Sequence, residues 1–163
     1  MNSGLSRDEI IRRIARGQKR TEIALDFGVT PQAVNYHLNG KGQRFKDPAQ
    51  LAVEHIPWDV RPEHKEGMPY RMLRSHLKWV VARGRGLSDG DKARLFNWYR
   101  ELVDLNLVVE YDPEAPPTHG LSSGGWRYLQ REESDNDLVI RVNDLSHMTD
   151  EAYEYFRLPI GAA

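Results

Sequence analysis

Two short segments within residues 20–39 have the pattern of helices joined by a tight turn, and this pattern constrains the fold most. On the first segment, apolar residues at offsets of three and four share one helix face: Ile23, Ala24 and Phe27. Gly28 follows where the chain must turn and where a residue without Cβ is favoured. Thr30 and Pro31 are typical of a helix start, because threonine caps a free amide and proline suits the first position. The stretch therefore predicts a helix-turn-helix.

The second helix of such a motif enters the major groove of DNA, where its early residues meet base edges. Val34 and Leu38 are expected to face inward, which leaves the polar side chains on the outside. Glutamine and asparagine amides can bind adenine with two hydrogen bonds, and an alanine methyl suits thymine. The residues predicted to contact DNA are Thr30, Gln32, Ala33, Asn35 and Tyr36. An ordinary helical hairpin packed in a core, with a merely solvated outer face, is the alternative.

An earlier helix completes a first domain, predicted over residues 1–46. Ser6 and Glu9 have the spacing of a capping box, an isoleucine stripe follows, and Gly17 is expected to close the helix. Residues 47–68 are predicted as a linker, partly helical, and residues 69–163 as a second domain.

The glycine-rich basic stretch at residues 39–48 reads as the end of the first domain. Lys41 and Arg44 are expected to follow the DNA backbone or to lie in a minor groove, as basic arms do. A solvated linker explains this stretch equally well.

The formal net charge of −1 conceals a strong asymmetry along the chain. Residues 1–46 contain nine Lys and Arg against four Asp and Glu, and residues 61–100 contain ten against four. Residues 101–163 contain four basic against thirteen acidic side chains. Because affinity for phosphate depends on local charge, two basic segments indicate two contacts with double-stranded DNA.

The second basic segment includes a helix that begins near Pro69. Its cations fall in a stripe roughly 60° wide at the rotation of an α-helix: Arg71, Arg74, Lys78 and Arg85. No acidic residue lies between Arg71 and Arg85, so ion pairs along the helix do not explain the stripe. A solvated face is the ordinary explanation of such a stripe. Beside a DNA-binding domain, however, we expect it to contact phosphates.

The run Arg83-Gly84-Arg85-Gly86 resembles the core of AT-hooks, in which an extended backbone lays two arginines in a narrow minor groove. The flanking prolines of that motif are absent, and the same glycines would also serve as a helix stop. In either form, Arg83 and Arg85 are predicted DNA contacts.

A second long helix is expected after Ser88, with a buried stripe of Leu95, Trp98, Tyr99, Leu102 and Leu105. Arg94 on this helix is a further candidate for DNA contact. Strands are predicted at 107–111, 125–131 and 138–142, with 134–137 as a hairpin turn, and Thr149 is expected to cap a last helix containing Tyr153 and Phe156. The predicted fold is mainly α with a small antiparallel β-sheet: a helix-turn-helix domain followed by an α+β domain like a winged helix.

Other classes of function have weak support. The chain has no cysteine, its six histidines are scattered, and no phosphate-binding or metal-binding motif is present, so we expect no enzyme activity and no cofactor. No apolar run approaches the ~20 residues that cross a bilayer, and no small-molecule ligand is evident. We expect a soluble protein of the bacterial cytoplasm.

Three stretches together resemble immunity repressors of temperate actinobacteriophages, particularly the cluster A mycobacteriophage type. They are residues 20–39, Ile-Pro-Trp-Asp-Val-Arg-Pro-Glu-His at 56–64, and Leu-Lys-Trp-Val-Val-Ala-Arg-Gly-Arg-Gly-Leu-Ser at 77–88. The resemblance implies a repressor that maintains lysogeny by binding an early lytic operator and related asymmetric sites. It also implies base reading by Gln32, Asn35 and Tyr36, and a second contact from the basic helix and the Arg83–Arg85 turn.

Two basic modules in one polypeptide can cover an asymmetric DNA site without a second copy. No leucine-heptad seam that would form a coiled-coil dimer follows residue 105. We therefore expect a monomer. A small terminase subunit, which packages DNA, also begins with a helix-turn-helix but should contain a helical oligomerisation segment. The DNA-binding part of a recombinase is the enzyme-linked alternative, and no catalytic constellation supports it.

Overall fold

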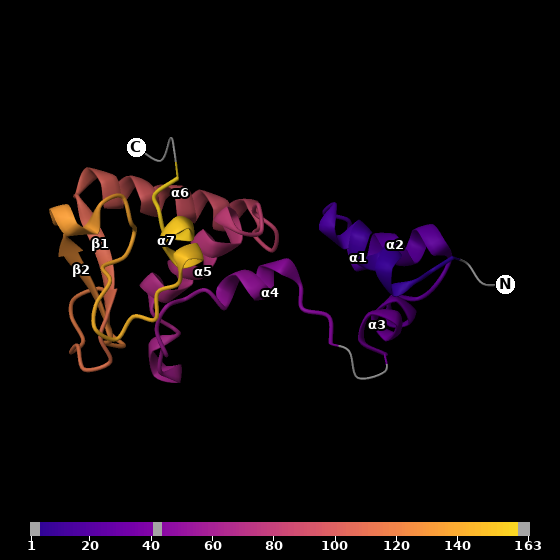
Figure 1. Cartoon of the computed structure of the whole chain (residues 1–163), viewed down its shortest axis with the longest axis horizontal. Coiled ribbons are helices and arrows are strands. Elements are labelled where there is room, and N and C mark those ends of the chain that lie inside the picture. Colours follow the sequence, from indigo (N-terminus) through magenta and orange to yellow (C-terminus); the bar gives the residue numbers. More distant parts are fainter. Residues whose placement is uncertain (1–3, 41–43, 160–163) are drawn as a thin grey trace. The chain divides into compact units, whose positions relative to one another are not determined.

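The computed structural model describes residues 4–40 and 44–159 and divides the chain into two compact units, Met1–Pro48 and Ala49–Ala163 (Figure 1). The first unit contains three helices: α1 (Arg7–Ala15), α2 (Arg20–Phe27) and α3 (Pro31–Asn39). The remaining elements are α4 (Pro48–Val53), α5 (Met68–Val80), α6 (Asp89–Asp104), β1 (Leu107–Tyr111), β2 (Trp126–Gln130) and α7 (Asp150–Tyr155), with 3-10 turns at Pro62–His64 and Glu133–Asp135.

The three helices of the first unit pack around one small apolar core, in which each helix contacts the other two. Its buried residues are Leu5, Ile10, Ile14, Ile23, Ala24, Val34 and Leu38. Ser6 caps α1 as predicted, because its Oγ accepts the Glu9 amide at 3.2 Å. The Glu9 carboxylate instead pairs with Arg13 at 2.9 Å and with Arg12 at 3.0 Å. The capping box is therefore only half formed.

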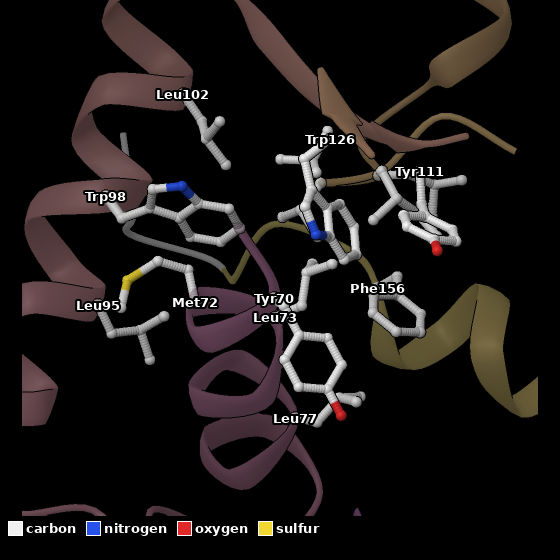
Figure 2. Close-up of a cluster of buried hydrophobic side chains, with 14 of the residues drawn as sticks. Tyr70, Met72, Leu73, Leu77, Leu95, Trp98, Leu102, Tyr111, Trp126 and Phe156 are labelled. Atoms are coloured by element: carbon white, nitrogen blue, oxygen red, sulfur yellow. The ribbon is translucent and has the colours of Figure 1, made fainter. Parts of the chain in front are cut away.

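The core of the second unit lies where α5, α6 and the sheet meet. Figure 2 shows Met72 of α5 beside Leu95 and Trp98 of α6, and Trp126 of β2 near the same cluster. The largest fully buried side chains of this unit are aromatic: Tyr99, Tyr111, Trp126 and Phe156.

The stretch expected as a linker contributes to this core. Ala52 and Trp58 are buried within it, and the Trp58 indole N–H donates to Asn143 Oδ1 at 3.1 Å. His64 is also buried, with its Nδ1 2.8 Å from the hydroxyl of Tyr111. Residues 49–64 are thus packed against elements that lie much later in the sequence.

The sheet consists of two antiparallel strands, in which Leu107 pairs with Gln130 and Tyr111 with Trp126. The predicted third strand at 138–142 is wrong as a hairpin partner of β2. Within the described residues it makes two isolated bridges, a parallel one between Ile140 and Val109 of β1 and an antiparallel one between Leu138 and Arg157. The chain crosses to the other edge of β1, where the Val109 amide donates to Val139 O at 3.0 Å. The expected hairpin turn is accordingly a 3-10 turn in this crossover.

Two apolar residues of the predicted helices are exposed, and one of them, Leu105, was expected in a buried stripe. Leu105 is 59% exposed, because α6 ends at Asp104 and Asn106 adopts a φ of 55° that turns the chain away. Tyr153 of α7 is 45% exposed, whereas Phe156 at its end is fully buried. The observed fold is nevertheless mainly helical with a small antiparallel sheet, as predicted.

Candidate nucleic-acid interface

The turn between α2 and α3 has the conformation that its residues favour. Gly28 ends α2 in the left-handed region at φ 64°, and the Val29 amide donates to Ala24 O at 2.9 Å. Thr30 caps α3, since its Oγ1 accepts the Ala33 amide at 3.2 Å, and Pro31 occupies the first helical position. The hydroxyl of Thr30 is therefore used within the chain, although the residue is exposed.

One face of α3 packs on the other helices and the opposite face is open. Val34 and Leu38 are fully buried. Gln32, Asn35 and Tyr36 are exposed, with Tyr36 at 75%, and Ala33 is half-buried. Two amides and a phenol thus form one polar, solvent-facing surface on a fixed helix.

A residue not singled out from the sequence joins this surface. Arg20, the first residue of α2, donates from Nη1 to Asn35 Oδ1 at 2.8 Å. Its guanidinium also lies 5.9 Å from the ring centroid of Phe45. Fifteen residues separate Arg20 from Asn35, so only the packing of α2 against α3 brings them together. The spacing of the two residues gave no signal of this contact.

The segment after α3 is attached to the same helix. The Phe45 amide donates to Asn39 Oδ1 at 2.9 Å, and the Asn39 side chain donates to Asn35 O at 3.2 Å. Arg44, a predicted DNA contact, immediately precedes Phe45 and is exposed. Lys41 lies outside the described residues.

A groove of about 510 Å³ in the second unit collects four of the predicted site residues. Arg71, Arg74 and Lys78 of α5 line it together with Arg94 of α6. The other lining residues are Met68, Met72, Ser75, Leu87 and Asp91. The sequence placed these cations on two separate helices, and the packing of α5 against α6 brings them into one groove.

The cations of this groove differ in their surroundings. Arg94 donates to Asp91 at 2.8 Å, and this hydrogen bond, with further ones from Ser88, lowers the pKa of Asp91 to about 2. Asp91 is therefore charged at neutral pH and offsets Arg94. Arg71 and Arg74 are exposed, and the Arg74 guanidinium lies 5.8 Å from the ring centroid of Tyr70. Lys78 lies alongside Gly86.

The run at 83–86 is a helix stop and does not have the extended backbone of an AT-hook. Arg83, Gly84 and Gly86 have φ angles of 53°, 83° and 79°, and the Gly84 amide donates to Lys78 O at 2.9 Å. The predicted stripe requires one helix that continues to Arg85. Because α5 ends at Val80, Arg85 lies outside that helix. Arg83 is exposed and Arg85 half-buried, and neither lines the groove.

Across residues 4–40 and 44–159, no group of three or more His, Asp or Glu side chains could hold a metal ion. In the same residues, no helix combines the length and the apolar character that spanning a bilayer requires.

Comparison with known proteins identifies the family. No protein-family model matches the chain. It is 39% identical over 148 residues to the repressor-like immunity protein of Mycobacterium phage L5, a match that covers 90% of this chain and 79% of the relative. Identity at this level over nearly the whole chain establishes common descent. The chain belongs to the immunity repressor family of actinobacteriophages.

Proposed function

We propose that this phage repressor acts by binding double-stranded DNA in a sequence-specific manner, with α3 as the recognition helix of a helix-turn-helix. The observation that carries the proposal is the arrangement of α2 and α3. A left-handed glycine and a threonine cap fix the turn, apolar residues fix the inner face, and Gln32, Asn35 and Tyr36 remain together on the outer face.

The chemistry of that outer face suits base edges in the major groove. The amides of Gln32 and Asn35 offer both a donor and an acceptor, as an adenine edge requires, and the Ala33 methyl suits thymine. Thr30 and Arg44 flank the helix at its start and beyond its end, where side chains and backbone amides meet phosphates. Gln32 and Asn35 therefore read sequence, and the flanking groups set the position of the helix.

We assign a second DNA contact to the groove between α5 and α6, with Arg71, Arg74 and Lys78 facing the phosphate backbone. Arg94 contributes less, because Asp91 already neutralises it. Arg83 and Arg85 extend the positive charge beyond the end of α5. In this assignment α5, α6 and the β1–β2 sheet act as a DNA-binding unit like a winged helix.

The relative's name indicates immunity, and we propose the same role for this chain. By binding an operator and related asymmetric sites in the cytoplasm of its bacterial host, the repressor would maintain lysogeny and block superinfection. Two DNA-binding units on one chain suit such sites, because the second contact becomes intramolecular once the first has formed.

The test is a footprinting titration on candidate promoter DNA with wild type, Gln32→Ala and Arg74→Ala. Gln32→Ala should lose about 1 to 3 kcal/mol at the specific site and almost nothing on unrelated DNA. Arg74→Ala should weaken binding to all sequences and reduce the slope of log K against log salt by about 1. Arg157→Ala, an exposed arginine in the acidic part of the chain, is the matched control and should bind like wild type.

Each half of the proposal can fail separately. If Gln32→Ala weakens specific and unrelated DNA equally, α3 does not read bases at that position. If Arg74→Ala keeps both the affinity and the salt slope of wild type, the groove is not a phosphate contact at that position.

A further inference from the structure

The contact between Arg20 and Asn35 bears directly on what α3 can recognise. Arg20 Nη1 donates to Asn35 Oδ1 at 2.8 Å, on the face of α3 assigned to base reading. The amide of Asn35 is therefore held with its oxygen toward Arg20 and its nitrogen turned away from it. A hydrogen bond fixes this orientation before DNA arrives.

The surroundings of Arg20 differ from those of an ordinary surface ion pair. Among the described residues, its partners are the neutral amide of Asn35 and the ring of Phe45, and no carboxylate pairs with it. Other arginines of this unit differ, since Arg12 and Arg13 both bind Glu9. Among the described residues no carboxylate offsets the charge of Arg20, and its remaining N–H groups can donate to other acceptors.

The backbone of Asn35 takes part in a further hydrogen bond. Asn39 donates to the Asn35 carbonyl, and Phe45, over which Arg20 lies, is bound to Asn39 through its amide. The arginine of α2, the two asparagines of α3 and the phenylalanine beyond α3 form one connected network, named here the Arg20 network.

We infer that Arg20 and Asn35 act together as a guanine-reading pair, in which Arg20 turns the base preference at this position from adenine to guanine; this inference rests on the proposed function of α3. A free asparagine binds adenine by accepting from N6 and donating to N7. In the Arg20 network, a guanidinium donor lies beside the asparagine oxygen and would oppose the N6 amino group. The asparagine nitrogen and the guanidinium together offer two donors, and guanine presents two acceptors, N7 and O6.

The experiment selects preferred sites from a random duplex library with wild type, Asn35→Ala, Arg20→Ala and Arg16→Ala. Asn35→Ala identifies the base pair that the Arg20–Asn35 pair reads, because preference at that position alone should change. Arg20→Ala should move the preference at that same position from guanine toward adenine, changing the ratio of the two affinities by about tenfold. Arg16→Ala removes an exposed arginine of the same unit and should leave every preference unchanged.

Folding is checked on each variant by circular dichroism. Arg20→Met retains the side-chain stem near Phe45 and removes the donors, so it should shift the preference in the same way. It replaces Arg20→Ala in the experiment if Arg20→Ala is unstable. If both Arg20 variants select the wild-type site and merely bind more weakly, Arg20 is a phosphate contact and the inference is overturned. If wild type itself selects no sequence, the proposed function fails instead.

Discussion

Buried histidine and tyrosine side chains bind each other at the centre of the second unit. His76 of α5 is fully buried, with Nδ1 2.6 Å from the Tyr99 hydroxyl and Nε2 2.6 Å from Tyr155 O. Because a carbonyl only accepts, Nε2 must carry the proton and Nδ1 must accept from Tyr99. The neutral ring therefore joins α5 to α6 and to the end of α7.

Burial lowers the pKa of His76 from 6.5 to about 4, so protonation favours the unfolded chain. Stability from this group is complete above pH 6.5 and declines as the pH falls toward 4, because the unfolded state then binds the extra proton. Between pH 7.5 and 4.5 wild type should lose roughly 2 to 3 kcal/mol through His76. Urea unfolding measures this loss, and His76→Gln should lack it while being less stable at pH 7.5.

The exposed residue His119 provides the control for this prediction. His119→Gln should show the same pH dependence as wild type. Equal pH slopes for wild type and His76→Gln would mean that His76 does not titrate as its burial implies.

At the scale of elements, the entry to β2 depends on a glycine. Gly125 has a φ of 83°, and a Cβ built on it would lie 2.6 Å from Nδ1 of His64. The buried His64 ring is held by Tyr111 and belongs to the last residue of the 3-10 turn, so it has little room to move. The Trp126 indole donates to His64 O at 2.8 Å, and this hydrogen bond joins the 3-10 turn to β2.

Gly125→Ala should destabilise the protein by about 2 to 4 kcal/mol, through overpacking as well as backbone strain. Gly120→Ala is the matched control, because Gly120 has a similar φ of 78° but a Cβ there meets nothing within 4 Å. Its cost should be about 1 to 2 kcal/mol from strain alone. Thermal unfolding of the two variants measures the difference, and equal losses would show that contact with His64 is unimportant.

Elements with local signals were predictable from the sequence. α3 begins at a threonine cap and proline as expected, and Ser88 caps α6 with its Oγ accepting the Asp91 amide at 3.1 Å. The β1 strand matches its predicted range, and β2 differs from its range by one residue at each end. In each case caps or alternation within a few residues determine the boundary.

Features that depend on tertiary contacts were not predictable in this way. Residues 138–142 have the composition of a strand, yet the Arg131 guanidinium binds Leu138 O at 2.8 Å within a crossover to the far edge of β1. Leu105 continues the apolar spacing of α6 one residue past the end of that helix. A helical projection cannot detect where the helix stops, and it placed Arg85 on α5 for the same reason.

The candidate site likewise has features that local spacing predicts and features that depend on tertiary contacts. Exposure of Gln32 and Asn35 followed from the spacing of buried residues on α3, whereas the bond from Arg20 to Asn35 required two helices to be packed. Likewise, the pairing of Arg94 with Asp91 follows from local spacing, but its place in a groove with Arg71 depends on α5 meeting α6.

At the scale of the whole molecule, charge is divided between segments. The basic segments contain α3 and the groove, and residues 101–163, with thirteen acidic against four basic side chains, contain the sheet and α7. Acidic surfaces are repelled by phosphate, so the acidic segment restricts which faces of the second unit can approach DNA. Each of the two proposed DNA contacts therefore lies in a basic segment, and both segments belong to one chain.

This arrangement predicts a monomer that covers a site without two-fold symmetry. A symmetric dimer would pair the same patch on both copies and bury roughly 800 Å² per partner. The most exposed large apolar side chains are instead Leu25 and Tyr36, which lie on the small first unit, and Leu105, which lies on the second. Sedimentation velocity should give one species near 18.8 kDa across concentrations, and a one-to-one complex with a duplex containing a single selected site. A duplex with two tandem sites, as a control, should bind two chains, and a stable free dimer or a palindromic footprint would contradict the prediction.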